Sequence, residues 1–253
     1  MSVANLKKAF MQLIDIIYPP RCPICQAYLR EEIVEADQVD FVFCRTCFDD
    51  FSEITSPLCT ICGKPFVSWV EGDHPCEDCI RKWPHYTRVV APYLYKGSLM
   101  TAIHQFKYAG KSYLAKTLGP LLASSARKWL TELDDALVMP VPLHPKRLRE
   151  RSFNQSLLLA RHVAPSLGFE LDFLALRRVR YTQPQTGLKK DQRRKNVRKA
   201  FDLKDPDVVK GRDIILVDDV TTTGNTLNEC ARVLKKSGAK NVFCVALART
   251  AVG

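Results

Sequence analysis

The segment 214–226 constrains the fold most, because an apolar run, two acids and a hydroxyl-rich turn follow one another there. The run 214–217 is bounded by polar residues, which is typical of a buried parallel strand. The residues after the turn have helical spacing, and Gly238 stands where a helix commonly ends. The turn therefore joins the carboxyl end of a strand to the start of a helix. Unpaired backbone N–H groups and the helix dipole favour a phosphate at that place.

Two adjacent carboxylates, Asp218 and Asp219, end the predicted strand and are placed to bind neighbouring hydroxyls or a hard metal ion. A ribose 5-phosphate would use both the acids and the turn, whereas a plain strand–turn–helix corner would leave the acids solvated. No lysine follows Gly224, which excludes a Walker A loop, and the single glycine excludes the dinucleotide fingerprint. The residues expected to hold the phosphate are Thr221, Thr222, Thr223, Gly224, Asn225 and Thr226.

This segment resembles the motif with which type I phosphoribosyltransferases bind 5-phosphoribosyl 1-pyrophosphate (PRPP). In that motif four apolar residues and two acids precede a turn rich in threonine and glycine. The resemblance implies that Asp218 and Asp219 contact the ribose hydroxyls or the Mg²⁺ that accompanies PRPP. It also argues against a 6-oxopurine acceptor, because Thr222 stands where that branch of the family has a carboxylate base.

Eight of the ten cysteines form four Cys-x-x-Cys pairs within 58 residues, a pattern that predicts two structural zinc sites. Each pair points two sulfurs at one ion, and two pairs complete a tetrahedral site. Tandem ribbons would join the first pair with the second, whereas a cross-braced module would join the first with the third. Disulfides or redox pairs are the other alternative. The predicted ligands are Cys22, Cys25, Cys44, Cys47, Cys59, Cys62, Cys76 and Cys79.

The zinc sites are expected to stabilise the fold, because four sulfurs leave no open position on the ion for catalysis. Residues 1–84 carry 8 Lys/Arg and 13 Asp/Glu, so this part of the chain would repel nucleic acid. An interaction with other proteins is the better hypothesis for it. Cys230 and Cys244 belong to no pair and are expected to be buried apolar side chains.

Positive charge is concentrated in residues 143–200, which carry 15 Lys/Arg and 4 Asp/Glu. This window precedes the acids and the turn, and it predicts an anion-binding surface beside them. Its first part is a predicted basic loop between a strand at 136–142 and a helix at 154–167. The alternative is a loop that is merely solvated. The cations expected to surround a pyrophosphate are Lys146, Arg147, Arg149 and Arg151.

Helices predicted at 93–111 and 111–130 and a further strand at 172–179 complete a strand–helix alternation, which implies a doubly wound parallel α/β sheet. Ligands of such sheets bind at the carboxyl ends of the strands, where the acids and the basic loop lie. The polar segment 179–197 is predicted to be a long loop, either a lid over the site or a solvated charge run. Residues 85–110 are expected to form the hood that selects the acceptor.

The chain divides into a predicted cysteine-rich module, residues 1–84, and an α/β domain, residues 85–253. Leu6, Phe10 and Leu13 share one face of a predicted N-terminal helix, for which packing is favoured over binding to a membrane surface. No apolar run approaches the roughly 18 residues of a membrane span, and no signal-peptide cleavage site follows the first helix. We therefore expect a cytoplasmic protein.

The cysteine pairs, RERSFNQ, TQPQTGLKKDQRRKNVRKAF and LVDDVTTTGNT together resemble the ComF family of competence-associated proteins. The resemblance extends from Tyr18 to Leu247. It implies a zinc-binding module, a phosphoribosyltransferase-like domain and a link to the uptake of single-stranded DNA, with other competence proteins as partners of the module. Ser152 departs from the family, which usually has glycine there.

Two functions follow from these readings. As an enzyme, the chain would bind PRPP and Mg²⁺, with Asp218, Asp219, Arg147 and Arg151 as the catalytic residues. As a binding module, it would hold single-stranded DNA on the basic window, with Phe153 or Tyr181 stacking on bases. Retention of both acids favours the first function, because a DNA-binding surface has no use for them.

Overall fold

The computed structural model describes residues 18–29, 35–36, 39–40, 43–66, 72–130, 132–182 and 190–251. The predicted N-terminal helix lies outside this part of the chain, as do residues 183–189 of the predicted lid. None of the helices described there has both the length and the apolar character that crossing a membrane requires.

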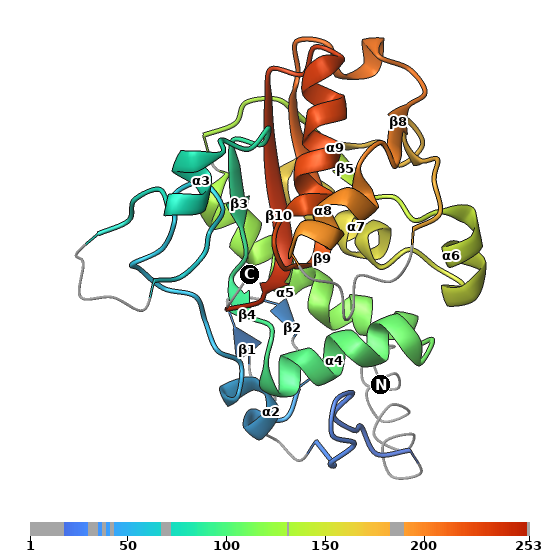
Figure 1. The fold of residues 1–253 in the computed structure, drawn as a ribbon. Helices are drawn as coiled ribbons and strands as arrows, with labels where there is room; N and C mark the ends of the chain where they lie inside the picture. The colour runs from blue at the N-terminus through green and yellow to red at the C-terminus, as the bar shows by residue number, and fades with distance from the viewer. Residues whose placement is uncertain are drawn as a thin grey trace.

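A parallel sheet forms the centre of the α/β part (Figure 1), in the order β3–β10–β9–β5–β6. Every pairing along this path is parallel, and β4 also pairs in parallel with β10. The predicted doubly wound parallel α/β sheet is confirmed. The strands are β3 (Arg88–Val90), β4 (Tyr93–Leu94), β5 (Ala136–Pro140), β6 (Glu170–Leu171), β9 (Asp213–Thr221) and β10 (Asn241–Arg249).

Helices cover both faces of the sheet, and the alternation of side chains along β9 shows why the apolar run is continuous. Ile215 and Val217 belong to the core under α5 and α7, whereas Ile214 and Leu216 belong to the core under α9. All four side chains are fully buried, as expected for a strand covered on both faces. The helices of this part are α4 (Gly97–Tyr108), the 3-10 turn η1 (Ser112–Leu114), α5 (Ala115–Trp129), α7 (Gln155–Leu167) and α9 (Asn225–Lys236).

The basic segment after β5 is a helix, α6 (Pro145–Arg151), so the prediction of a loop was wrong there. Pro145 occupies the first turn, where its missing N–H costs nothing, and the His144 ring accepts a hydrogen bond from the Lys146 N–H at 3.2 Å. The helix ends at Ser152, which has a left-handed φ of 66°. None of its residues is buried, so it lacks the apolar periodicity by which helices are recognised in a sequence.

The segment 172–179 does not join the parallel sheet as predicted. Its strand β7 (Leu176–Arg178) pairs antiparallel with β8 (Phe201–Leu203) in a separate ribbon, and β6 takes the edge of the main sheet. A helix, α8 (Lys190–Val197), lies within the segment predicted to be a loop. Val197 is buried, and the next turn is fixed by a 2.7 Å hydrogen bond from the Lys199 N–H to Glu229. The 3-10 turn η2 (Asp207–Val209) leads into β9.

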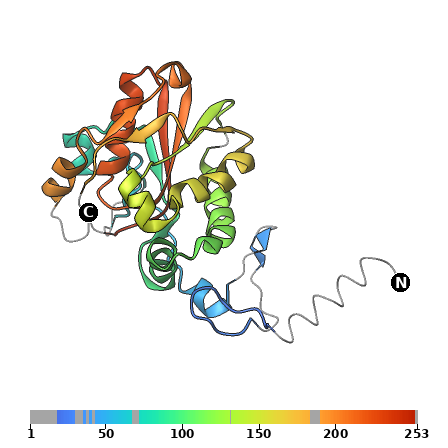
Figure 2. The same cartoon turned by 90° about the vertical axis from the view of Figure 1, so that its right-hand side faces the viewer.

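The cysteine-rich part contains short elements: β1 (Glu35–Ala36), β2 (Val39–Asp40), α2 (Arg45–Asp49) and α3 (Glu77–Arg81). It packs directly on the α/β part, and Figure 2 shows the green helices next to the blue N-terminal segment. The Gln105 amide on α4 donates to the Ile24 carbonyl at 3.1 Å, and the Val89 N–H on β3 donates to the Ile61 carbonyl at 2.8 Å. The domain boundary at residue 84 remains a prediction.

Candidate functional site

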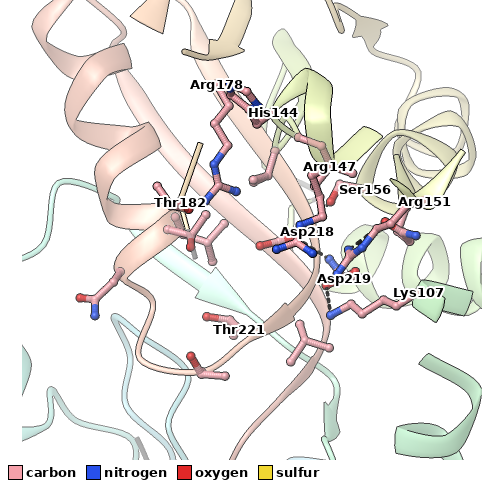
Figure 3. A pocket seen from close by; sticks show the side chains of 18 of the residues that line it. Lys107, His144, Arg147, Arg151, Ser156, Arg178, Thr182, Asp218, Asp219 and Thr221 are labelled. Carbon is pink, nitrogen blue, oxygen red and sulfur yellow. Dashed lines mark hydrogen bonds and ion pairs between the residues drawn. The ribbon is translucent and has the colours of Figure 1, made fainter. Parts of the chain in front are cut away.

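A cavity of about 720 Å³ opens at the carboxyl ends of β5 and β9 (Figure 3). Its walls come from α4, α6, the start of α7, the segment that follows β7, and the turn between β9 and α9. This is where open parallel sheets bind ligands, because adjacent connections leave the sheet in opposite directions there. The predicted acids, most of the predicted phosphate turn and part of the basic segment all line this cavity.

Asp218 and Asp219 lie on the cavity floor near the end of β9. Asp218 accepts hydrogen bonds from the Ser156 hydroxyl at 3.0 Å and from the Asp219 N–H at 2.9 Å. Burial, together with the neighbouring Asp219 charge, raises the pKa of Asp218 to about 7. Near neutral pH this carboxyl can therefore change its charge, which is unusual for an aspartate.

Lys107 on α4 is a site residue that the sequence did not reveal. Its ammonium lies 2.7 Å from Asp219 Oδ1, and its side chain is only 16% exposed. Burial alone would lower the pKa of Lys107, but the Asp219 carboxylate raises it, so the lysine stays charged. A single lysine within an apolar helix gives no sequence signal, because its partner lies more than 100 positions further along the chain.

The predicted phosphate turn begins helix α9. Gly224 is the N-cap residue with a left-handed φ of 71°, a conformation that other residues adopt only with strain. Side-chain atoms of Thr221, Thr223 and Asn225 are buried and have no hydrogen-bond partner among the described residues. Such groups are normally satisfied, so their presence at the start of a helix fits an anionic ligand. Five of the six predicted residues line the cavity, Thr223 being the exception.

The four predicted pyrophosphate residues separate into two pairs on α6. Arg147 and Arg151 line the cavity, whereas Lys146 and Arg149 are exposed and do not. Arg147 forms an ion pair with Glu150 at 3.0 Å, and Arg151 donates to the Gln155 side chain at 3.2 Å. A helix turns successive residues to different sides, whereas a loop would have allowed all four cations to converge.

Arg178, at the end of β7, is the second site residue that the sequence analysis missed. Its guanidinium lines the cavity and donates to Thr182, while its Nε is buried without a partner among the described residues. Burial lowers the pKa of Arg178, which reflects the cost of holding this charge out of water. No described carboxylate forms an ion pair with it, so an anionic ligand would complete the contacts of this group.

Three aromatic side chains form the side of the cavity nearest α4. Tyr95, His104 and Tyr108 line this side, with the His104 and Tyr108 ring centroids 4.7 Å apart. The Arg151 guanidinium lies 5.1 Å from the Tyr108 centroid, which joins this side to the cationic one. All three residues fall in the segment 85–110, whose predicted role in selecting an acceptor remains a prediction.

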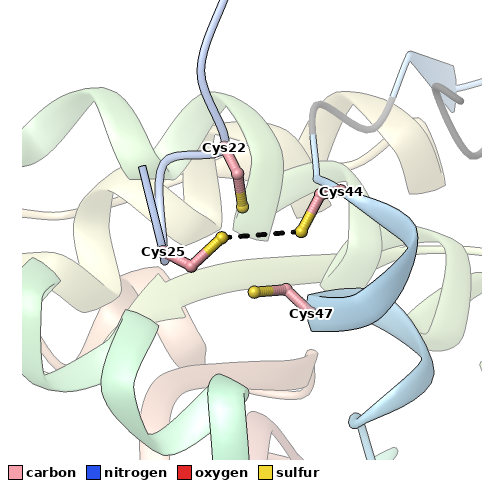
Figure 4. Close-up of side chains that lie close together, drawn as sticks. All are labelled: Cys22, Cys25, Cys44 and Cys47. Carbon is pink, nitrogen blue, oxygen red and sulfur yellow. Dashed lines mark hydrogen bonds between the residues drawn. The ribbon is translucent and has the colours of Figure 1, made fainter. Parts of the chain in front are cut away.

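The eight paired cysteines gather into two clusters, each with all four sulfurs within 4.8 Å of one another. Cys25 and Cys44 are 3.6 Å apart (Figure 4), and Cys62 and Cys76 are 3.8 Å apart. A Zn–S distance of about 2.3 Å requires about 3.8 Å between tetrahedral sulfurs, so both clusters fit zinc and neither fits a disulfide. The tandem pairing is confirmed, and the cross-braced alternative is wrong.

Two known domain families match this chain. A double zinc ribbon domain matches residues 13–80, and a phosphoribosyl transferase domain matches residues 154–253. The DNA utilization protein YhgH of Escherichia coli O157:H7 is 36% identical over 197 residues, which cover 76% of this chain and 84% of that protein. Competence protein F of Haemophilus influenzae is 31% identical over 198 residues, covering 76% and 85%. The chain belongs to the ComF family.

A further ComF relative, Competence protein ComFC of Bacillus subtilis, is 27% identical over 241 residues, covering 90% of this chain and 95% of that protein. The resemblance seen in the sequence motifs is thereby confirmed. Within this ComF chain, Cys230 and Cys244 are fully buried in the core under α9, as expected for residues outside the zinc sites. This chain thus combines a double zinc ribbon with a phosphoribosyltransferase domain.

Proposed function

We propose that this protein binds PRPP in the cavity at the end of β9 and acts as a phosphoribosyltransferase in the handling of incoming DNA. One observation carries the proposal: two acids, a preformed phosphate turn and cationic side chains surround a single cavity. PRPP has the matching groups, namely ribose hydroxyls, a 5-phosphate and a pyrophosphate. A simple phosphate site would have no use for Asp218 and Asp219.

In this proposal the ribose 2- and 3-hydroxyls donate to Asp218 and Asp219. The backbone N–H groups and side chains between Thr221 and Thr226 hold the 5-phosphate at the start of α9. Arg147, Arg151 and Arg178 hold the pyrophosphate with charged hydrogen bonds. Lys107 pairs with Asp219 and offsets part of the negative charge that a polyanionic ligand would meet on the cavity floor.

Mg²⁺ fits this site as a companion of the ligand. The described residues place two carboxylates and no further acid in the cavity, and Mg²⁺ characteristically uses one or two carboxylates together with substrate phosphates. Asp218 and Asp219 are the residues that would hold it, and the ion would offset charge on the departing pyrophosphate.

The chain's own contribution to catalysis is the placement of positive charge. Breaking the bond from C1 to pyrophosphate leaves an oxocarbenium-like centre and moves electrons onto the leaving oxygen. Arg147, Arg151 and Arg178 stabilise that oxygen, and the aromatic side of the cavity limits access of water to C1. The acceptor would enter past Tyr95 and Tyr108. Thr222 supplies no carboxylate base, which argues against 6-oxopurines.

The biological setting is inferred from the relatives, two of which are named for competence and one for DNA utilization. A second candidate function, direct binding of single-stranded DNA, is supported by α6 and its surroundings. Lys146 Nζ lies 4.7 Å from the Tyr181 ring centroid, which places a cation beside a ring able to stack on bases. Phe153 is less suited to this role, because it packs on Phe106 with centroids 5.6 Å apart.

Calorimetry with PRPP and Mg²⁺ tests the first function. The double substitution Asp218→Asn and Asp219→Asn removes charged hydrogen bonds worth roughly 1.5–3 kcal/mol each, so affinity should fall at least about tenfold. The matched control is Asp202→Asn with Asp205→Asn, because both of these carboxylates are exposed and lie outside the cavity. Equal affinities for the double variant and the wild type would refute this site.

The DNA function has its own test on exposed charges. The substitutions Lys146→Glu and Arg149→Glu change two cations that do not line the cavity. Fluorescence anisotropy measures the affinity for a single-stranded oligonucleotide at several salt concentrations. The affinity should fall, and the slope of its logarithm against the logarithm of salt concentration should decrease by roughly one per cation removed. PRPP affinity should be retained. Loss of PRPP affinity instead would show that these residues reach the pyrophosphate, and unchanged oligonucleotide binding would exclude this surface.

A further inference from the structure

The second cysteine cluster, Cys59, Cys62, Cys76 and Cys79, lies close to the phosphate turn. Six residues after Cys79, the last residue of this cluster, the His85 N–H donates to the Asn228 side chain on α9 at 2.7 Å. The next residue, Tyr86, is 5% exposed, and a Cβ at Gly224 would come within 3.1 Å of its hydroxyl oxygen. The chain that leaves the cluster therefore supports both the turn and the first part of the helix that follows it.

A second connection runs through the end of β10. Arg249 is 4% exposed, donates to the Cys62 carbonyl, and has an Nε without a partner among the described residues. A zinc ion bound by four thiolates carries a formal charge of −2, so this buried guanidinium fits beside an occupied cluster. The adjacent Thr250 N–H donates to the Thr221 carbonyl at 3.1 Å. At the end of β10, Arg249 thus contacts the cluster, and the next residue, Thr250, contacts the start of the turn.

The backbone around Cys62 is packed too closely to move independently of the sheet. The Val89 N–H donates to the Ile61 carbonyl at 2.8 Å. Gly63, with a left-handed φ of 68°, approaches β3 so closely that a Cβ there would lie 2.7 Å from the Val89 carbonyl oxygen. Displacement of the backbone at residues 61–63 would therefore displace β3 and the segment at Tyr86, which leads into β3.

The first cysteine cluster makes different contacts, which provides a comparison within the same molecule. Between Cys22 and Cys25, the Ile24 carbonyl accepts from Gln105 on α4. After Cys47, the Asp50 carboxylate accepts from the Ser98 N–H at 2.6 Å, at the start of the same helix. These contacts hold α4, which contributes Lys107 and Tyr108 to the cavity.

We propose that the zinc-bound second cluster positions the phosphate turn, with Tyr86 and Arg249 as the positioning residues that connect them. The inference rests on the proposed function in so far as the turn binds the 5-phosphate of PRPP. Loss of metal from this cluster would free the backbone around Cys62, loosen the packing of Tyr86 on Gly224 and lower the affinity for phosphate. Loss of metal from the first cluster would leave the turn in place.

Amide hydrogen exchange on the full-length chain without ligand tests the connection itself. Cys76→Ser in the second cluster is compared with Cys44→Ser in the first, and zinc analysis should find one remaining ion in each. Exchange in residues 221–230 should accelerate at least about tenfold for Cys76→Ser and stay near the wild-type rate for Cys44→Ser. Equal exchange rates in the two variants, or an unchanged turn in Cys76→Ser, would overturn the proposal.

A second variant keeps both clusters intact. Arg249→Met removes the donor to Cys62, and Arg88→Met on β3 is the control, because that guanidinium lies over the Trp129 ring away from the cavity. Calorimetry with ribose 5-phosphate should show about a fivefold loss of affinity for Arg249→Met alone, with two zinc ions retained. Wild-type affinity in Arg249→Met would contradict the role of Arg249. If the wild type itself does not bind ribose 5-phosphate, the proposed function fails, while the exchange experiment still decides whether the cluster positions the turn.

Discussion

The phosphate turn and the cationic wall of the cavity are built in different ways. The acids and the turn come from one continuous segment, 218–226, that ends a strand and begins a helix. The wall is assembled from three elements far apart in the chain, and its members are Lys107, Arg147, Arg151 and Arg178. A site made mainly of backbone geometry can be recognised in a sequence, whereas a site made of side chains depends on the tertiary fold.

The polar groups of the two regions also differ in whether other residues of the protein already satisfy them. The turn holds buried polar atoms that have no partner among the described residues. Each cation of the wall already has a partner: Lys107 is paired with Asp219 and Arg147 with Glu150, while Arg151 donates to Gln155 and Arg178 to Thr182. Only the Nε atoms of Arg151 and Arg178 are buried there without a partner among the described residues. We therefore expect the turn to bind as a preformed site and the wall to exchange internal contacts for contacts with the ligand.

The largest effect is expected from the turn. Gly224→Ala places a side chain on a left-handed residue and against the Tyr86 hydroxyl, so PRPP and ribose 5-phosphate should both lose at least about tenfold in affinity. Gly211→Ala is the control, because Gly211 has a φ of 72° but nothing within 4 Å of a new Cβ. Calorimetry measures both. If Gly224→Ala and Gly211→Ala have the same affinity for both ligands, the change at Gly224 has no effect of its own on binding, and the turn is not the site.

A smaller and more selective loss is expected from the wall. Arg178→Gln removes a charged hydrogen-bond donor, so affinity for pyrophosphate should fall about tenfold while affinity for ribose 5-phosphate is retained. Arg177→Gln is the control on the same strand, because Arg177 is exposed and paired with Asp202. An equal loss for both ligands in Arg178→Gln would show that the wall and the turn do not divide the ligand between them.

The pH dependence of binding separates the acids from the rest. Burial, followed by repulsion from Asp219, raises the pKa of Asp218 to about 7. Only the ionised carboxylate can form charged hydrogen bonds with the ribose hydroxyls. Between pH 6 and pH 8 its ionised fraction rises about tenfold, so affinity for ribose 5-phosphate should rise by up to that factor. The ligand phosphate also titrates near pH 6, and Asp218→Asn corrects for it. Identical pH profiles for wild type and variant would contradict the assignment.

The smallest effect concerns the helix that carries part of the wall. Ser152 ends α6 with a φ of 66°, a conformation that favours glycine. Ser152→Gly should therefore raise the free energy of unfolding by about 0.5–1 kcal/mol. The greater conformational entropy of glycine in the unfolded chain offsets part of this gain. Urea titration should show a higher midpoint with an unchanged slope. A lower midpoint would mean that the serine side chain makes a stabilising contact that outweighs the strain.

Sequence reasoning succeeded where short segments determine their own structure. The run into Asp218 identified a strand buried on both faces, and the Cys-x-x-Cys spacing identified both zinc clusters. It failed where a contact joins distant elements. Nothing near Lys107 in the chain indicates Asp219, and the basic window 143–200 did not distinguish Arg178 from its other cations. The charged helix α6 was missed for a related reason, since it has no buried face to give it an apolar period.

In the proposed complex one cavity holds both ends of one ligand, the ribose 5-phosphate on the acids and the turn, and the pyrophosphate on the wall. Competition calorimetry with Mg²⁺ compares PRPP with ribose 5-phosphate alone and with pyrophosphate alone. Because PRPP links the two halves, it should bind at least about a hundredfold more tightly than either, and each half should compete with it. Pyrophosphate that binds as tightly as PRPP, or ribose 5-phosphate that binds without displacing it, would contradict this account.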